Sequence, residues 1–343
     1  MEKLAEIPDV RSGQSKFRGG SLVLRRAGES STVAVPSLSE RNAEGAMNEA
    51  IGHASDFPSS GSGIHVRRID VPLTNEVPRH WCRNEPCSTH LLNALSSVFP
   101  IGERFFIRSV LYYSKTFRDD PRLSAEVRAF VAQEGLHNRE HERHIEMLVD
   151  QGYSGVLTRN KVIDTVFRWL NKRQPVTSLA ATAALEHLTA TLSRVVLTDD
   201  RVVYGMDPRM HALWQWHALE ECEHKAVAYD VLERISTSYW LRVYVLVVNT
   251  LGLIVGTVER TLYMLWKDGE LFKRKTWRDG WRALFASGRP KTSELGYQPR
   301  GVLRDIAPYY LAWYRRDFHP SQLDDSRFIA EYQRHFAAAV ADP

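Results

Sequence analysis

The chain has 343 residues, of which 43% are hydrophobic, and this is enough to bury a sizeable core. Its formal net charge is +4, and 45 basic residues are scattered among 41 acidic ones, so nucleic acid is not expected as a partner. Three cysteines are too few for a disulfide framework, and the N-terminus lacks the basic stretch and apolar run of a secretory signal. The composition predicts a globular protein of the cytoplasm.

Residues 1–75 are predicted to form a flexible N-terminal tail that ends in a short extended segment. Up to about residue 63 the chain is rich in Ser, Gly, Ala and charged residues, and such a composition cannot bury much surface. Residues 64–73 contain spaced apolar side chains interrupted by Arg67, Arg68 and Pro72, a pattern typical of an extended segment. Residues 76–343 are predicted to form one helical domain with a C-terminal helical extension.

Helical periodicity begins near Ser88 and predicts an all-α fold built on four main helices. The expected helices cover residues 88–115, 121–152 and 177–197, and a fourth follows Asp207-Pro208 and extends past Val231. A shorter connecting helix is expected at about residues 162–170. Each main helix has an apolar face with a carboxylate or an imidazole near its centre, which is unusual because an unpaired buried charge costs several kcal/mol.

The acidic and imidazole side chains on these faces follow a regular order. Two helices each present one glutamate, and two present a Glu-x-x-His pair, whose side chains point the same way because residues three apart share a helix face. The set is Glu103, Glu134, His137, Glu186, Glu221 and His224. This is the ligand set of di-iron carboxylate bundles, so the sequence predicts a ferritin-like four-helix bundle with two iron ions, or manganese in their place.

Three further residues are candidates for the same site. His217 precedes Glu221 by one helical turn, and His141 follows His137 by one turn, so either could be a ligand or a core histidine paired with a carboxylate. Glu220 competes with Glu221 as the ligand if the register of the fourth helix is shifted by one residue. The alternative to a metal site places Glu134 and Glu221 on solvated faces, with Arg139 and Lys225 as their partners.

A separate zinc site is conceivable before the first helix. Cys82 and Cys87 lie between His80 and His90, but four residues separate the thiols and there is no second Cys pair. A capped loop that leads into the helix is the preferred interpretation.

Several segments resemble a known bacterial family, generically called predicted metal-dependent hydrolases. The resemblance covers roughly residues 75–325 and is carried by Glu134-Gly-Leu-His-Asn-Arg-Glu-His141, Leu185-Glu-His187, Trp216-His-Ala-Leu-Glu-Glu-Cys-Glu-His-Lys225, Ala228-Tyr-Asp-Val231 and Phe318-His-Pro320. The ligand order is also similar to that of ferritin-like di-iron N-oxygenases that oxidise arylamines, whose third histidine is matched by His217. This resemblance implies an iron set that adds His217 to the six residues above.

The expected function is a di-iron oxygenase, either an N-oxygenase or a hydroxylase, in which Glu134, Glu221 and His217 are catalytic. Such an enzyme needs dioxygen, an external electron donor or redox partner, and a small-molecule substrate. A metal-dependent hydrolase that uses a metal-activated water is the first alternative, because it needs the same ligands. A non-catalytic ferritin-like metal-binding protein is the second.

Residues 243–258 contain no charge and are flanked by aromatic side chains, namely Tyr239, Trp240, Tyr263 and Trp266. Sixteen residues are short for a membrane span of about 20 residues, so a helix buried against the bundle is preferred. The alternative is a surface for peripheral membrane contact or for a hydrophobic substrate. A homodimer is also compatible with the sequence.

Overall fold

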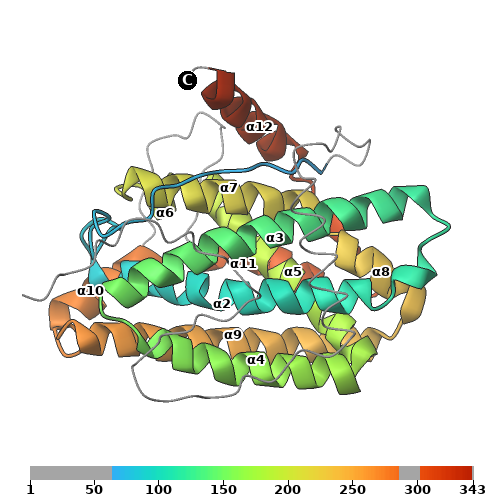
Figure 1. Ribbon diagram of the computed structural model, residues 1–343, viewed down its shortest axis with the longest axis horizontal. Coiled ribbons are helices and arrows are strands. Elements are labelled where there is room, and N and C mark those ends of the chain that lie inside the picture. Colours follow the sequence, from blue (N-terminus) through green and yellow to red (C-terminus); the bar gives the residue numbers. More distant parts are fainter. Residues whose placement is uncertain (1–63, 286–301, 342–343) are drawn as a thin grey trace, which may run out of the picture. The chain divides into compact units, whose positions relative to one another are not determined.

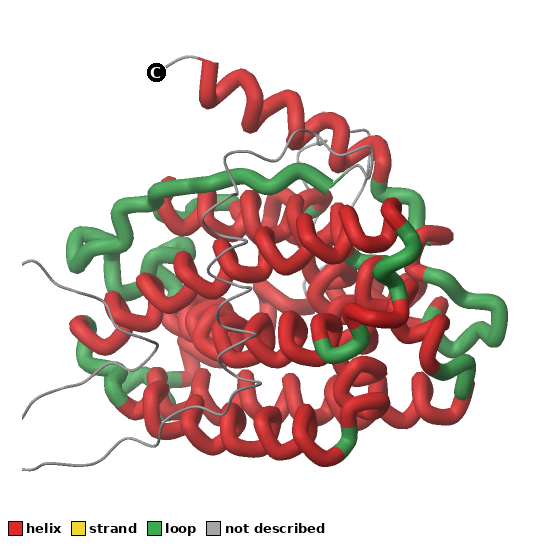
Figure 2. Tube along the Cα trace, turned by 45° about the vertical axis from the view of Figure 1, so that its right-hand side comes forward, coloured by secondary structure: helices red, strands yellow, loops and turns green. Residues whose placement is uncertain are grey.

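The computed structural model describes residues 64–285 and 302–341, which lie in one compact unit of the chain, Ser39–Pro343. The longer helices are α2 (Pro86–Leu111), α3 (Pro121–Asp150), α4 (Gly155–Arg173), α5 (Pro175–Thr198), α7 (Pro208–His224) and α9 (Tyr239–Lys267), as labelled in Figure 1. The shorter ones are α6 (Asp200–Val203), α8 (Val227–Ile235), α10 (Arg274–Phe285), α11 (Val302–Ala312) and α12 (Ser326–Ala341). Within these ranges the chain forms no β-strand (Figure 2), so the all-α prediction is confirmed. The predicted N-terminal tail, residues 1–63, lies outside the described residues.

Proline begins each of the four main helices, and an acidic side chain caps three of them, α2, α3 and α7. The side chain of Glu85 accepts hydrogen bonds from the backbone N–H groups of Cys87 and Ser88, and Asp120 caps α3 in the same way through Leu123. Asp207 caps α7, and proline is the first residue of α2, α3, α5 and α7. Proline is tolerated there because the first N–H groups of a helix have no partner within it.

Four helices surround the centre of the fold. α2 packs along α3 and α5 packs along α7, while contacts of α2 with α5 and of α3 with α7 close the group. α9 lies on α2 and α5, and α4 contacts the same two helices, so α4 and α9 cover one side of the four (Figure 1). The side chains between these helices form two apolar clusters in which Phe105, Phe130, Leu136 and Trp216 are almost fully buried.

Three predicted boundaries were wrong. The first main helix ends at Leu111 rather than near residue 115, which falls in a short 3-10 turn, and the connecting helix α4 is longer than predicted. The fourth main helix ends at His224, and a new helix, α8, begins at Val227, although the apolar spacing continues through both. The apolar positions of α8 pack on α3 and α5, so a bend in the chain maintains the burial that the periodicity reflects.

Residues 64–73 contain no strand, and they run along α7 (Figure 1). The backbone N–H of Arg67 donates to Glu220 at 2.9 Å, and the backbone N–H of His65 donates to Glu223 at 3.1 Å. The extended segment is therefore held by glutamates of α7 instead of by a neighbouring strand.

The prediction of a buried helix at residues 243–258 was half right. The segment is helical and forms the middle of α9, which packs on α2 and α5, but only 22% of its most apolar window is buried. Large apolar side chains on its outer face remain exposed, such as Leu251 at 58% and Val255 at 66%. By length and composition alone, α9 is the one described helix that could cross a membrane.

Candidate metal centre

Four helices carry the predicted ligands to the centre of the fold. α2 supplies Glu103, α5 supplies Glu186, and α3 and α7 supply the two Glu-x-x-His pairs together with His217. Each of these side chains is at most 3% exposed, although four of them are carboxylates. Burial of so many acids around imidazoles requires positive charge nearby, from protons or from metal ions.

The distances show that the side chains converge. His224 Nε2 lies 3.1 Å from a carboxylate oxygen of Glu134 and 3.1 Å from one of Glu186. On the other side, His217 Nε2 lies 2.9 Å from Glu221 Oε1, and His137 Nδ1 lies 3.6 Å from the same oxygen. Donor atoms from α3, α5 and α7 therefore share one small volume.

The donor atoms fall into overlapping groups in which all atoms lie within 4.8 Å of one another. One group is Glu103, Glu134 and His137, and another is Glu134, Glu221 and His224. Glu221 also groups with His137 and His217. Glu134, His137 and Glu221 each belong to two of these groups, so the groups form one continuous cluster.

Unpaired polar atoms test whether a metal fits this cluster. Both carboxylate oxygens of Glu103, Glu134 and Glu186 are buried without a hydrogen bond, and so are one oxygen of Glu221, Nδ1 of His137 and Nε2 of His224. His137 and His224 contact these acids only at ion-pair distances of 3.1 to 3.8 Å. Buried polar atoms are normally paired, so this concentration of unpaired oxygen and nitrogen atoms needs an explanation. Divalent cations would satisfy them, and the mixed oxygen and nitrogen donors suit iron, manganese or zinc.

The pKa values of the clustered side chains also indicate that the buried acids need positive charge beside them. Burial, together with the neighbouring Glu134, raises the pKa of Glu103 well above its usual range, and burial raises the pKa of Glu186 to about 8. Burial opposes a charge on His137, but Glu134 and Glu220 outweigh it and raise the pKa of this imidazole to about 10. Without metal, the cluster therefore retains protons that compensate its acids.

Glu220 does not share the central volume, although it is fully buried beside Glu221. Its Oε2 lies 3.1 Å from His137 Nε2, the ring nitrogen that faces away from the other ligands, and its Oε1 accepts from the backbone of Arg67. Such a carboxylate fixes the tautomer and orientation of a metal-binding histidine. The register of α7 therefore directs Glu221 to the centre and Glu220 to the support of His137.

On the opposite side of the cluster, Gln133 orients His224 as Glu220 orients His137, and this contact was not predicted from the sequence. Gln133 Oε1 lies 2.9 Å from His224 Nδ1, which leaves Nε2 free to face the carboxylates, and the amide nitrogen of Gln133 donates to Glu223. Gln133 directly precedes Glu134, and this adjacency is the only signal in the sequence. The partner of a glutamine cannot be read from its position.

His141 lies at the edge of the cluster. Its Nε2 forms a short hydrogen bond with Nδ1 of His217, and its Nδ1 lies 2.7 Å from Ser96 Oγ. Burial and the neighbouring His217 hold the pKa of His141 well below its usual range, so the ring is neutral. Ser96 also contacts His144, which is buried. His141 and His217 each have hydrogen-bond partners on both nitrogens, in contrast to His137 and His224.

The alternative prediction, which placed Glu134 and Glu221 on solvated faces, is wrong. Arg139 pairs with Glu140, and Lys225 pairs with Asp325, so neither cation reaches Glu134 or Glu221. The two glutamates face the interior because they lie on the apolar faces of α3 and α7.

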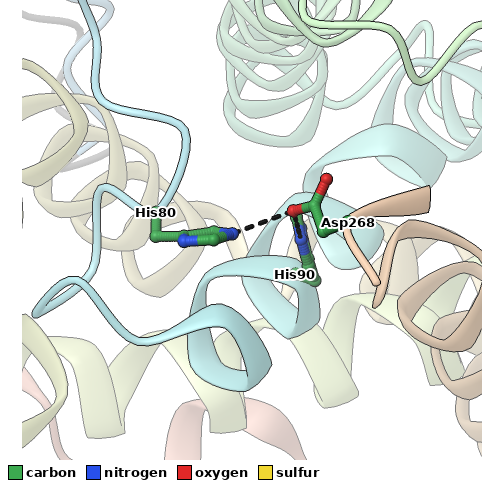
Figure 3. A group of neighbouring side chains, drawn as sticks. All are labelled: His80, His90 and Asp268. Carbon is green, nitrogen blue, oxygen red and sulfur yellow. Dashed lines mark hydrogen bonds and ion pairs between the residues drawn. The ribbon is translucent and has the colours of Figure 1, made fainter. Parts of the chain in front are cut away.

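A second group of possible ligands differs from the first because its carboxylate oxygens already have hydrogen-bond partners. His80 and His90 both direct Nε2 at one oxygen of Asp268, at 2.8 Å each (Figure 3). Arg79 and Tyr153 contact the same carboxylate at 2.7 and 2.8 Å. Since Asp268 is already saturated and a guanidinium lies beside it, this group needs no cation. It ties the loop before α2 to the end of α9.

The histidines of the conceivable zinc site point away from its cysteines. His80 and His90 both direct Nε2 to Asp268 instead of to a thiol. Burial raises the pKa of the Cys82 thiol and raises the pKa of Cys87 to about 11, so both thiols are protonated in the absence of metal. The preference for a capped loop is confirmed, because Glu85 caps α2 here.

Comparison with known proteins gives one match. A search of curated proteins and a search of solved structures each found no match. A family model described as predicted metal-dependent hydrolase matches residues 65–324, a range that contains every residue of the buried cluster. Since the match spans most of the 343 residues, the chain belongs to the predicted metal-dependent hydrolase family.

Proposed function

We propose that this protein is a metal-dependent hydrolase whose active centre is the buried cluster of Glu103, Glu134, His137, Glu186, His217, Glu221 and His224. The observation that carries the proposal is the set of buried carboxylate and imidazole atoms without hydrogen-bond partners. The family description points to the same chemistry. The expected oxygenase is therefore replaced as the leading function by its first alternative.

The cluster is proposed to hold two divalent ions. Seven donor side chains exceed what one ion of six-fold preference uses, and Glu134 and Glu221 belong to overlapping groups from which they could bridge a pair. The order of the ligands along the four helices supports a ferritin-like arrangement. Iron or manganese suits these donors, and zinc is the redox-inactive competitor.

A divalent ion bound there would supply a Lewis acid and lower the pKa of water. The chain itself contributes three things. Glu134 and Glu221 compensate positive charge, as do the neighbouring carboxylates, and Glu220 and Gln133 orient the imidazoles of His137 and His224. Aromatic rings exclude bulk solvent, since Phe130 and Trp216 lie edge-on to these imidazoles with ring centroids 5.0 and 4.8 Å away.

Glu103 is the proposed proton carrier of the site. It lies in one group with Glu134 and His137 and in another with His141 and His217, and neither of its oxygens has a hydrogen bond. Of the seven donors, Glu103 is proposed to be the one that alternates between ligand and proton acceptor, taking a proton from an attacking water and delivering it to a leaving group. The substrate is proposed to be a small ester, amide or phosphate.

Activation of dioxygen is the second candidate. The order Glu, Glu-x-x-His, Glu, Glu-x-x-His on successive helices is the one that di-iron carboxylate proteins use, and it favours redox-active ions. This function needs an external electron donor or redox partner, which a hydrolase does not.

The origin of the product oxygen separates the two functions. Protein loaded with manganese, iron or zinc is incubated with a panel of esters, amides and phosphate esters in isotope-labelled water, with and without dioxygen and reductant. A hydrolase incorporates the label from water under anaerobic conditions and remains active with zinc. Label from dioxygen, incorporated only with iron and reductant, would replace the proposal with the second candidate.

Matched variants link the activity to the cluster. Glu134→Ala and Glu221→Ala are expected to abolish turnover and to lower the metal content. Glu142→Ala is the control, because this glutamate lies on the outer face of α3 with 53% of its side chain exposed and pairs with Arg104. Equal losses in all three variants would contradict the assignment of the site.

A further inference from the structure

We propose that the outer faces of α4 and α9 form a docking surface for an anionic lipid bilayer. This inference is independent of the proposed function, because it rests on residues outside the buried cluster.

The outer face of α9 is apolar along almost its whole length. Exposed side chains recur at helical spacing, and they are Trp240, Tyr244, Val247, Val248, Leu251, Ile254, Val255, Val258, Leu262 and Trp266. The exposed charges along this face are Glu259, which pairs with Arg159 of α4, and Lys267 at the end. At 29 residues the helix is about 43 Å long, so this stripe is much longer than the scattered apolar residues of an ordinary surface.

α4 widens the stripe. Its N-terminal half lies against α9, since Asn160 contacts Arg260 and the backbone N–H of Gly155 donates to Tyr263. Val162, Val166 and Trp169 repeat along the outer side of α4, and each is at least half exposed. Both helices rest on α2 and α5, so their outer sides face away from the same layer (Figure 1).

Aromatic residues stand at the ends of this apolar surface. Trp240 is 71% exposed near the start of α9, and Trp266 is 62% exposed near its end. Tryptophan prefers the boundary between the hydrocarbon and headgroup regions of a bilayer, because its ring is apolar and its N–H is polar. Trp277 and Trp281 of α10 are exposed as well.

Positive charge borders the apolar surface. Residues 155–173 contain five basic residues and one acidic residue, and residues 267–282 contain six basic and three acidic, which gives +7 in these segments against +4 for the whole chain. The exposed basic side chains include Lys161, Lys172, Arg173, Arg274 and Arg282. Basic residues at the rim of an apolar helix face are typical of binding to anionic headgroups.

The charge argues for lipid over a second copy of the chain. Two copies that met through this surface would bring basic rims together, and like charges across an interface are unfavourable. The negative charge of an anionic bilayer complements the basic residues at the border of the apolar surface.

α9 is proposed to lie in the plane of the membrane surface and not to span the bilayer. Its inner face carries Arg242 and Arg260, which are buried and bonded to the rest of the fold, for example Arg242 to the backbone oxygen of Arg315 at 2.9 Å. Moving α9 across a bilayer would pull both guanidinium groups away from their partners and remove α9 from α2 and α5. That cost exceeds what one apolar helix of this kind recovers.

The test is flotation of the full chain with vesicles. Vesicles of phosphatidylcholine alone are compared with vesicles that also contain phosphatidylglycerol, at low and high salt. The protein is expected to bind the anionic vesicles at least ten-fold more strongly, with several-fold weakening at high salt. Absence of binding to either vesicle would overturn the proposal, and so would binding that resists both high salt and carbonate, since that indicates a span.

Variants locate the surface. The double variant Leu251→Asp/Val255→Asp is expected to bind anionic vesicles at least ten-fold more weakly, while Tyr204→Asp, at a site 76% exposed before α7, binds like the wild type. Equal metal content and circular dichroism verify that each variant is folded. Lys172→Glu/Arg173→Glu is expected to lose the preference for anionic lipid. Unchanged binding by the double aspartate variant would refute the assignment.

A cysteine introduced into the surface tests whether lipid or protein covers it. Leu251→Cys is expected to stay monomeric and to be shielded from a water-soluble thiol reagent only when vesicles are present. A disulfide-linked dimer through this cysteine without lipid, or a cross-link to residues 1–63, would show that protein covers the surface and would overturn the lipid proposal.

Discussion

The neighbouring acids Glu220 and Glu221 give the sharpest test of the site. We expect Glu220→Gln to weaken metal binding by about ten-fold to a hundred-fold, or about 1.4 to 2.8 kcal/mol, because it removes the charged acceptor that orients His137 through a contact of 3.1 Å. Glu221→Gln removes a ligand that lies 2.9 Å from His217 and 3.6 Å from His224, so its loss should exceed a hundred-fold.

The assay is competition for Mn²⁺ between the protein and a chelator of known affinity, followed by electron paramagnetic resonance. Circular dichroism confirms that both variants are folded, and glutamine preserves the side-chain shape at each position. The loss of Mn²⁺ affinity in Glu221→Gln is expected to exceed the loss in Glu220→Gln. If Glu220→Gln removed the metal and Glu221→Gln retained it, the register of α7 and the ligand set would both be refuted.

Three further predictions follow from the electrostatics and packing. Burial gives Glu186 a pKa of about 8, and Glu134 and Glu220 give His137 a pKa of about 10 against the opposing effect of burial, so metal must displace protons. Mn²⁺ affinity should therefore rise from about pH 6 to pH 8 with proton release on calorimetry, and a flat profile would contradict this. Asp268→Asn should destabilise the fold by about 2 kcal/mol in urea but leave the metal content unchanged, since its carboxylate anchors a structural tie. Gly280→Ala should cost about 1 to 3 kcal/mol, because its Cβ would lie 2.3 Å from the sulfur of Cys87; an unchanged urea midpoint would show that α10 packs differently.

The convergence of the candidate ligands could be predicted because helical geometry links spacing to direction. Glu134 and His137 lie three residues apart on one apolar face, and the same spacing recurs at Glu221 and His224, so both pairs had to point inward once their helices were assigned. Acids on an apolar face need compensation, and this indicated a shared centre.

The supporting contacts could not be predicted, because they join residues far apart in the sequence. Arg67 reaches Glu220 across 153 positions, and Gln133 reaches His224 across 91. Such pairs depend on how the helices pack, and no periodicity encodes them. The distinction between Glu220 and Glu221 was open for the same reason.

The exposure of α9 was wrongly predicted for a different reason. An uncharged run of sixteen residues fits a core helix, and its length falls short of a membrane span. The sequence does not reveal that α2 and α5 cover only one side of it. A helix was predicted where α4 lies, but not its exposed face, because Val162 and Trp169 resemble core positions in the sequence.

Anomalous diffraction from crystals soaked in Mn²⁺ tests the central claim most directly. The cluster of orphaned carboxylates and imidazoles is predicted to hold two peaks, each within bonding distance of Glu134 or Glu221 and of at least one histidine among His137, His217 and His224. No peak is expected at His80, His90 and Asp268, where every acid oxygen already has a partner. A peak at that second group, with none in the four-helix cluster, would contradict the metal centre on which this account depends.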